Sequence, residues 1–379
     1  MLPSLPSDAV QVVIAGQMPP PYGGQNINIK RVHDMLAAEK GLCVRHLKFE
    51  FTKSWEGVRR FEISKIIELL RVVGRAIKLR MEGPIDMLLY PVGGPHTSPI
   101  LRDLVLLPVL RLLSRRVVLH FRAAGLREYL ELASPGFRRL IRGIYRHCGG
   151  EAVVLTTYGR RDPASVGISS IRVIPNAFED LAGDDFQRTA PPGKTVLSVG
   201  HICEDKGTPS LIRAFKSIAA RDPEASLVLV GETLAPYTEQ DLKKEIAGCG
   251  LEDRVIWKGI LHGVDLEQAY KEADLFVFSS VAPYESFGMV LIEAMQWSLP
   301  LIVTDWRANV SVCGEGFGGV IAGNVEEDLG AALHEALQTA MDRQDCWLEW
   351  GRHNRGYFKV HYEISTMKRN YLDLVAPLR

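Results

Sequence analysis

The chain has 379 residues, of which 46% are apolar and 24% charged, and its formal net charge is zero. These values are ordinary for a soluble globular protein and exclude a disordered or collagen-like chain. A chain of this length is too long to fold around a single compact hydrophobic core, and it is long enough for two domains of ordinary size.

Charge is distributed unevenly along the chain. Residues 1–180 carry 26 Lys and Arg against 16 Asp and Glu, and the remainder carries 19 against 29. Such asymmetry suggests that the basic half meets an anionic surface; the alternative is that two domains simply differ in charge. We expect no nucleic-acid partner.

The six cysteines are scattered, with no spacing typical of a zinc site or a disulfide framework, which favours a reducing cytosol. The N-terminal MLPSLPSDAV lacks the basic start and long apolar core of a signal peptide. The most apolar stretch, residues 104–113, is too short to span a bilayer. We therefore expect a cytoplasmic protein, with peripheral attachment to the inner face of the membrane as an open alternative.

Short apolar runs alternate with helical patterns along the whole chain. Runs that are apolar on both faces indicate parallel strands buried under helices. The series restarts after residues 180–194, which are rich in Gly, Pro and charge and resemble an interdomain linker. The expected strands are 11–16, 43–49, 86–92, 117–123, 152–157 and 171–177, then 195–200, 226–232, 254–259, 275–280, 299–305 and 318–323.

This pattern predicts an α/β chain with two tandem Rossmann-like, doubly wound domains facing a central cleft. The predicted domains are 1–185 and 186–355, followed by a helix over 356–379 that packs back toward the N-terminal domain. In such sheets, ligands bind beyond the carboxyl ends of the strands.

Two strand–helix junctions have the character of anion-binding loops. Gly23 and Gly24 precede a helix, where glycine permits close approach and the helix start offers N–H groups. Lys206 precedes a helix that we expect Thr208 to cap and Pro209 to open. A lysine there is unfavourable unless an anion such as phosphate offsets it. The alternatives are a ligand-free turn and a solvated lysine. No GxGxxG follows any expected strand, which argues against a dehydrogenase.

The stretch APYESFGMVLIEAM, residues 282–295, places Glu285 and Glu293 eight residues apart. Ser286 is the expected N-cap of a helix through Trp297. Two carboxylates beside a phosphate site suit the hydroxyls of a nucleotide sugar, one at the sugar and one at the ribose. The alternative is a helix-start glutamate and a surface glutamate. The N–H groups left unpaired at the helix start would be those of Phe287, Gly288, Met289 and Val290.

Residues 58–80 place apolar side chains on one helical face among basic ones, and residues 136–147 are also basic. Basic amphipathic helices bind anionic membrane. The alternative is that these apolar faces only cover the sheet. The apolar positions of the first segment are Ile63, Ile66, Ile67, Leu70, Val73 and Ile77.

The 282–295 stretch resembles the E-x7-E motif of retaining glycosyltransferases of family 4, which have the GT-B fold. PPPYGG resembles the family's N-terminal Gly-Gly loop and GHICEDKG its lysine-bearing loop. PLIVTD is similar to the strand after the motif and HYEISTMKRNYLDL to the closing helix. The match is nearly continuous from residue 195 onward and patchy before it.

The resemblance implies a role for each matching residue. Glu293 would bind the donor ribose, Glu285 the transferred sugar and Lys206 the diphosphate. Gly23 and Gly24 would bring the N-terminal loop to the phosphate or sugar, with the 287–290 amides lining that region. His120, in VVLHFRAAG, would lie near the anomeric centre; alone, it would be interpreted as a structural histidine.

The chain departs from the family pattern in three places. His201 stands where an arginine is usual, and a neutral imidazole does not replace a bidentate guanidinium. His201 is still expected to be donor-binding: either phosphate binding depends more on Lys206, or the ligand protonates His201. Trp297 and Ser298 stand where small residues and glycine are common, and TDWRANVSVCGEG replaces a frequent Gly-Gly pair. No metal-binding motif is evident, and in this family helix N-termini and basic residues stabilise the leaving diphosphate.

We therefore predict a retaining glycosyltransferase with an N-terminal acceptor-binding and a C-terminal nucleotide-sugar-binding domain. It would take a UDP or GDP sugar and no other cofactor, and it would act on a saccharide or lipid-linked saccharide. The other hypotheses are a GT-B epimerase or phosphorylase and a degenerate, non-catalytic GT-B binding protein.

Overall fold

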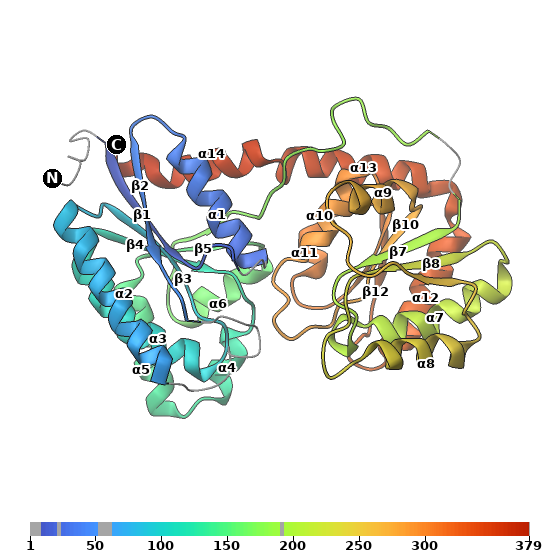
Figure 1. The fold of residues 1–379 in the computed structure, drawn as a ribbon, viewed down its shortest axis with the longest axis horizontal. Coiled ribbons are helices and arrows are strands. Elements are labelled where there is room, and N and C mark those ends of the chain that lie inside the picture. Colours follow the sequence, from blue (N-terminus) through green and yellow to red (C-terminus); the bar gives the residue numbers. More distant parts are fainter. Residues whose placement is uncertain (1–8, 21–23, 52–62, 190–192, 379) are drawn as a thin grey trace. The chain divides into compact units, whose positions relative to one another are not determined.

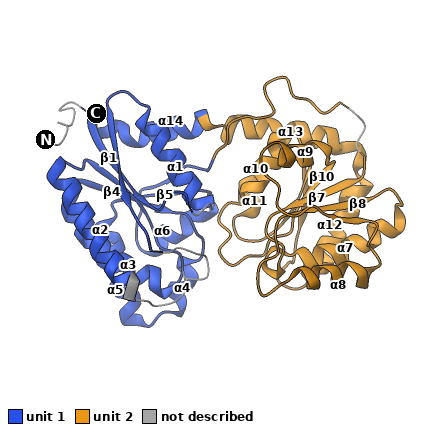
Figure 2. Ribbon diagram, in the orientation of Figure 1, with its two compact units in different colours: residues 1–176, 365–379 blue, residues 177–364 orange. Residues whose placement is uncertain are grey.

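The computed structural model describes residues 9–20, 24–51, 63–189 and 193–378, and all twelve expected strands lie within them. They form two six-stranded sheets in which every neighbouring pair of strands is parallel (Figure 1). Each sheet belongs to one of two compact units (Figure 2). The predicted α/β class with two doubly wound domains is confirmed.

Unit 1 comprises residues 1–176 and 365–379, and the order of its strands is β2-β1-β3-β4-β5-β6. The central strands are apolar on both faces and fully buried because helices cover both sides of the sheet. The strands are β1 (Val10–Gly16), β2 (Leu42–Lys48), β3 (Met87–Pro91), β4 (Arg116–Phe121), β5 (Glu151–Val154) and β6 (Ile171–Val173). The helices are α1 (Gly24–Ala37), α2 (Ile63–Glu82), α3 (Thr97–Leu113), α4 (Leu126–Leu132), α5 (Pro135–Cys148), α6 (Arg161–Ser165) and α14 (Ile364–Val375).

Unit 2 comprises residues 177–364, and the order of its strands is β12-β11-β10-β7-β8-β9. The order reverses between β7 and β10, and in open α/β sheets ligands bind at such a reversal, beyond the carboxyl ends of the strands. The strands are β7 (Thr195–Val199), β8 (Ser226–Val230), β9 (Val255–Trp257), β10 (Leu275–Phe278), β11 (Leu301–Thr304) and β12 (Gly319–Ala322). The helices are α7 (Thr208–Arg221), α8 (Glu239–Cys249), α9 (Val264–Glu272), α10 (Met289–Gln296), α11 (Asn309–Cys313), α12 (Leu329–Asp342) and α13 (Trp347–His361).

The chain passes from unit 1 to unit 2 after residue 176, earlier than the expected 185. Residues beyond 176 belong to unit 2 because their side chains bind there: Asp180 accepts two hydrogen bonds from Arg355, and Arg188 donates to three backbone carbonyls of unit 2. The C-terminal segment is two helices, not one. Helix α13 packs in unit 2, and residues 365–379 return to unit 1.

A buried polar cluster organises the carboxyl end of β3 in unit 1. Asp103 on α3 is fully buried and accepts hydrogen bonds from the Tyr90 hydroxyl at 2.7 Å, the Tyr145 hydroxyl at 2.8 Å and the Gly93 N–H at 2.7 Å. The Arg102 guanidinium contacts the same carboxylate at 2.7 Å. Burial alone would lower the pKa of Arg102, but the Asp103 carboxylate raises it above the ordinary value. One carboxylate thus satisfies four groups from α3, α5, β3 and the loop after β3.

The two basic segments singled out in the sequence form α2 and α5, apart from residues 58–62, which lie outside the described part. Helix α2 buries Val72 and Ala76 against the sheet, whereas Ile66, Leu70 and Ile77 are exposed. One hypothesis from the sequence was that the apolar face of this segment only covers the sheet. That hypothesis is wrong for most of the face, because most of its apolar side chains are exposed. Among the described helices, none combines the length and apolar character needed to cross a bilayer.

Candidate functional site

The loops after β7 and β10 are tied together at the point where the strand order of unit 2 reverses. The Ser279 hydroxyl donates to the Lys206 carbonyl at 2.7 Å, and the Val281 N–H donates to the Asp205 carbonyl at 2.9 Å. Gly207 separates Lys206 from α7, and a Cβ there would come within 2.2 Å of the Ser279 carbonyl oxygen. Only glycine lets the two loops approach this closely while adopting a φ of +69°.

Lys206 and Glu285 meet across these loops. The Lys206 Nζ lies 2.6 Å from a Glu285 carboxylate oxygen, and the side chains are 27% and 12% exposed. Ser280 Oγ donates to the same carboxylate at 3.0 Å and the Gly288 N–H donates to its other oxygen at 3.2 Å. Burial would raise the pKa of Glu285, but the Lys206 ammonium and these hydrogen bonds outweigh it and hold the pKa below the ordinary value. The carboxylate is therefore ionised and held from three sides.

Helix α10 begins at Met289, two residues later than a Ser286 N-cap implies. Gly288 occupies the cap position with a φ of +66°, and a Cβ there would meet the Phe278 ring at 3.0 Å. Phe287 turns into the core and is 2% exposed. The N–H groups at the helix start are therefore those from Met289 and Val290 onward, while the Gly288 N–H is already bound by Glu285.

The predicted cap of α7 is also displaced by one residue. Gly207 is the cap and Thr208 is the first helical residue, with Pro209 next. Lys206 ends a short 3₁₀ turn, Glu204–Lys206, directly before that cap. Its ammonium thus stands beside a helix start, as the sequence predicted.

Glu293 lies on α10, in the turn that follows the helix start, and is half-buried. The Tyr270 hydroxyl from α9 donates to its carboxylate at 2.7 Å. Burial and this carboxylate raise the pKa of Tyr270 well above the ordinary value, so that the phenol remains a donor. The sequence analysis missed this contact of Tyr270, because Tyr270 lies 23 residues before Glu293 and only the packing of α9 beside α10 brings the two together.

If Glu293 binds the donor ribose, as the resemblance implies, replacing Tyr270 with phenylalanine is expected to weaken nucleoside-diphosphate binding about tenfold, because a hydrogen bond to a charged group contributes about 1.5 kcal/mol and orients Glu293. Calorimetry would measure the affinity, with turnover at saturating donor changing less than twofold. Tyr129→Phe, which removes an exposed hydroxyl in unit 1, is the matched control. Unchanged affinity with a lowered melting temperature would mean that the hydroxyl serves the fold alone.

His201 follows the Gly200 turn after β7, and its side chain is half-exposed. Its Nδ1 lies 3.8 Å from a Glu232 carboxylate oxygen. Burial and the Lys206 ammonium hold the pKa of His201 below its ordinary value, against the opposing effect of Glu232. The imidazole is therefore neutral near pH 7, and Lys206 is the fixed positive charge of this loop.

The remaining predicted site residues belong to unit 1. His120, at the end of β4, is buried, and its carbonyl accepts a hydrogen bond from the Val92 N–H at 3.0 Å. Burial, with Arg122, holds the pKa of His120 well below its ordinary value, and its Nε2 has no hydrogen-bond partner. Gly24 opens α1, and a Cβ there would meet no atom within 4 Å, so packing does not require glycine. Gly23 lies outside the described residues.

The departures from the family pattern have local structural explanations. Trp297 is buried edge-to-face against Phe186 of the linker, and Lys271 stacks over it at 4.6 Å. In the loop after β11, the Trp306 indole donates to the Ala282 carbonyl at 2.9 Å, which fixes this loop beside the one that carries Glu285. Arg307 adopts a φ of +47°, in the region where glycine is favoured.

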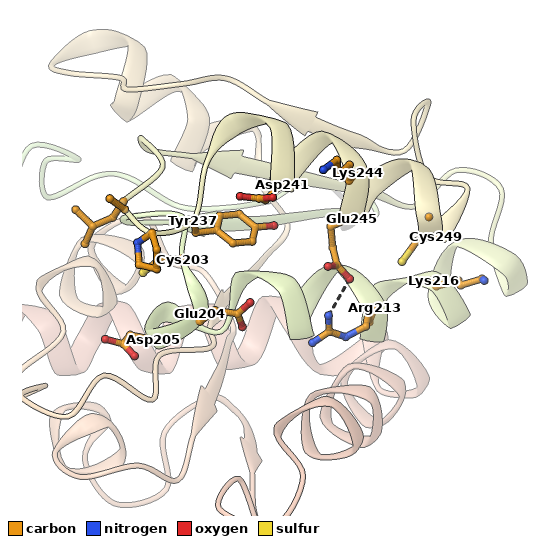
Figure 3. Close-up of a pocket in the computed structure, with 14 residues that line it drawn as sticks. Cys203, Glu204, Asp205, Arg213, Lys216, Tyr237, Asp241, Lys244, Glu245 and Cys249 are labelled. Atoms are coloured by element: carbon orange, nitrogen blue, oxygen red, sulfur yellow. Dashed lines mark hydrogen bonds and ion pairs between the residues drawn. The ribbon is translucent and has the colours of Figure 1, made fainter.

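A pocket in unit 2 lies between α7 and α8, and the loop after β8 closes one side of it. Figure 3 shows Tyr237, Asp241 and the Arg213–Glu245 ion pair around it. None of the predicted site residues lines this pocket. The pocket nevertheless borders the loop of Lys206, because Cys203, Glu204 and Asp205, which directly precede that lysine, line it.

Comparison with known proteins gives consistent results. The family model for glycosyl transferases group 1 matches residues 184–347. The chain is 37% identical over 179 residues to mannosylfructose-phosphate synthase of Agrobacterium fabrum, covering 42% of this chain and 38% of that protein. It is 32% identical over 210 residues to GDP-mannose:cellobiosyl-diphosphopolyprenol alpha-mannosyltransferase of Xanthomonas campestris, covering 55% and 53%. The chain thus spans about half or less of the length of these curated relatives.

Solved structures share the whole fold at low sequence identity. Sucrose-phosphate synthase of Thermosynechococcus elongatus superposes with a TM-score of 0.74 at 17% identity, covering 97% of this chain and 98% of that one. Anabaena Alr3699/HepE in complex with UDP gives a TM-score of 0.69 at 16% identity, covering 97% and 99%. Both are similar in fold throughout, which identifies the architecture as GT-B. Residues 184–347, which carry Lys206, Glu285 and Glu293, are the part of the chain that is similar to the group 1 glycosyl transferases.

Proposed function

We propose that this protein is a retaining glycosyltransferase that moves a hexose from a UDP or GDP sugar to a hydroxyl of a saccharide or lipid-linked saccharide. The observation that carries the proposal is the Lys206–Glu285 pair, 2.6 Å apart where the strand order of unit 2 reverses. A helix start and Glu293 follow it. These groups supply a cation, the backbone N–H groups of a helix start and two carboxylates, which are the requirements of a nucleotide sugar.

In this proposal Lys206 binds the donor diphosphate. An ammonium has three N–H donors, and the contact with Glu285 uses one of them, so phosphate oxygens can take the others. Glu285 accepts hydroxyls of the transferred sugar, and Glu293, held by Tyr270, accepts the ribose hydroxyls. The start of α10 adds its N–H groups to the region of the leaving group. We expect no metal ion or other cofactor.

In the reaction, the bond between the anomeric carbon and the diphosphate oxygen breaks, and the acceptor oxygen bonds to the same face of the sugar. The acceptor's proton passes to the leaving phosphate. Glu285 positions the sugar and is not a nucleophile. Positioning and electrostatic stabilisation of the departing diphosphate then supply most of the acceleration.

The known relatives support the donor and acceptor classes. Alpha-monoglucosyldiacylglycerol synthase of Streptococcus pneumoniae, 28% identical over 153 residues, is named for a lipid product, and the Xanthomonas enzyme for a diphosphopolyprenol acceptor. Anabaena Alr3699/HepE has also been solved with UDP-glucose. A lipid-linked acceptor for this chain is consistent with the basic character of residues 1–180.

A nucleotide panel tests the donor assignment. A nucleoside diphosphate at a hundred times its Kd would add about 2.7 kcal/mol of stability, which raises the melting temperature of a domain this size by about 5–10 °C. UDP, GDP and their hexose conjugates are to be compared with ADP and CDP at millimolar concentration. If none of them stabilises the protein, the proposal fails and the non-catalytic alternative gains support. Conversion of the sugar nucleotide without acceptor would indicate an epimerase.

A further inference from the structure

Helix α2 turns a row of large apolar side chains to solvent. Ile66, Leu70, Ile77 and Met81 are spaced by four, seven and four residues and therefore share one face of the helix. Leu70 is 67% exposed and Met81 83%. A different face of α2, which contains Val72 and Ala76, is buried and packs against the rest of unit 1. The exposed row is therefore not needed to hold α2 in place.

The neighbouring helix repeats the arrangement. Helix α3 packs against α2 and exposes Leu101, Val105 and Leu112, which are spaced by four and seven residues. Leu112 is 87% exposed. Isolated exposed apolar residues are ordinary, but two aligned rows on adjacent helices are typical of an interaction surface. We name this surface the α2/α3 face, made of Ile66, Ile67, Leu70, Ile77, Met81, Leu101, Val105 and Leu112.

The charges beside the α2/α3 face are almost all positive. Helices α2, α3 and α5 together carry eleven Lys and Arg residues and three acidic ones. Of the three acids, Glu68 and Asp103 are buried, which leaves Glu82 as the acid that reaches solvent on these helices. Helix α5 packs on the other side of α3 (Figure 1). Exposed basic side chains on these helices include Arg71, Lys78, Arg80, Arg111, Arg139, Arg142 and Arg146.

We infer that the α2/α3 face binds an anionic lipid bilayer. The apolar rows would enter the boundary between headgroups and acyl chains, and the flanking Arg71 and Lys78 would lie at the phosphates. The charges favour this occupant over a second copy of the chain, because two copies joined through this face would bring their basic side chains together without acidic partners. The inference stands independently of the proposed transfer reaction.

Vesicle sedimentation tests the inference with the full chain. The protein is to be mixed with vesicles of phosphatidylcholine containing about 40% phosphatidylglycerol, and with vesicles of phosphatidylcholine alone. We expect binding to the anionic vesicles that is at least tenfold stronger than to the neutral ones and that weakens as salt is added.

Two double variants separate the apolar and electrostatic contributions. Leu70→Gln with Ile77→Gln removes apolar anchors, and Arg71→Glu with Lys78→Glu reverses the flanking charge. Each is expected to reduce binding to the anionic vesicles at least tenfold. Because all four side chains are exposed, the melting temperature should stay within about 2 °C of the wild type.

Matched controls lie on helices of unit 2. Val264→Gln replaces an apolar residue of α9 that is 75% exposed, and Lys216→Glu with Lys243→Glu reverses two exposed lysines of α7 and α8. These variants should bind like the wild type. Equal binding by all variants, or no binding to anionic vesicles, would overturn the inference. Dimerisation that Leu70→Gln with Ile77→Gln abolishes, without any vesicle binding, would instead assign the face to a second copy.

Discussion

Replacing Lys206 with alanine is expected to lower kcat/KM for sugar transfer by about 10²–10³-fold, which is the usual cost of removing one preorganised group that stabilises a departing anion. The loss should be large because His201, the nearest basic side chain in the same loop, has a lowered pKa and is neutral near pH 7. No second fixed charge in that loop would compensate. Initial rates against donor concentration would measure the effect.

Two variants make this result interpretable. Lys216→Ala removes an exposed lysine of α7 and should leave kcat/KM within twofold of the wild type. Glu285→Gln, combined with Lys206→Ala in a double-mutant cycle, should show strong non-additivity because the two side chains are 2.6 Å apart. A loss below fivefold in Lys206→Ala, with the protein folded, would remove Lys206 from the proposed diphosphate site.

Replacing Asp103 with asparagine should reduce the free energy of unfolding by about 3–5 kcal/mol, the cost of breaking a buried ion pair by removing one partner. The amide would keep the shape of the side chain but would leave Arg102 without its counter-charge and would accept fewer of the five hydrogen bonds that Asp103 accepts. Urea denaturation followed by circular dichroism would measure the change.

Asp34→Asn provides the comparison for this experiment. Asp34 forms an exposed ion pair with Lys30 on α1, and exposed pairs contribute about 0–1 kcal/mol. If Asp103→Asn costs no more than Asp34→Asn, the buried cluster does not hold the carboxyl end of β3 as we describe.

The sequence predicted the strands well because a buried parallel strand is apolar on both faces, and such runs are distinctive. The Lys206 and Glu285 loops were predicted for a related reason: each follows a strand whose end is well marked. Their mutual contact required a further fact, the reversal of strand order between β7 and β10, which no single segment encodes.

Helix starts were predicted less well. Ser286 is a residue type that often caps helices, yet the helix begins only after Gly288. Gly288 has a positive φ, and it has no side chain that would meet the Phe278 ring. That constraint comes from another element of the fold. Tyr270 escaped prediction for the same reason, since a tyrosine on an amphipathic helix has no local feature that indicates its partner.

The orientation of α2 was the least accessible feature. Helical periodicity shows that apolar residues share one face of a helix. The periodicity does not show whether that face packs against the core or faces solvent. Val72 and Ala76 supply a second, smaller apolar face that packs inward, and it leaves the larger residues at the surface. Deciding between the two faces required the packed structure.

Unit 1 is interrupted in sequence by the whole of unit 2, and this arrangement has a consequence for synthesis. Tyr371 and Leu374 of α14 are buried in unit 1, and the Leu374 carbonyl accepts a hydrogen bond from Arg116 on β4. A ribosome must therefore add roughly 190 further residues after Asn176, which takes roughly 10–40 s, before the first unit has its last helix. Unit 2 is the first to have all its residues available. Unit 1 therefore remains incomplete while unit 2 folds, and α14 is the last segment that unit 1 needs.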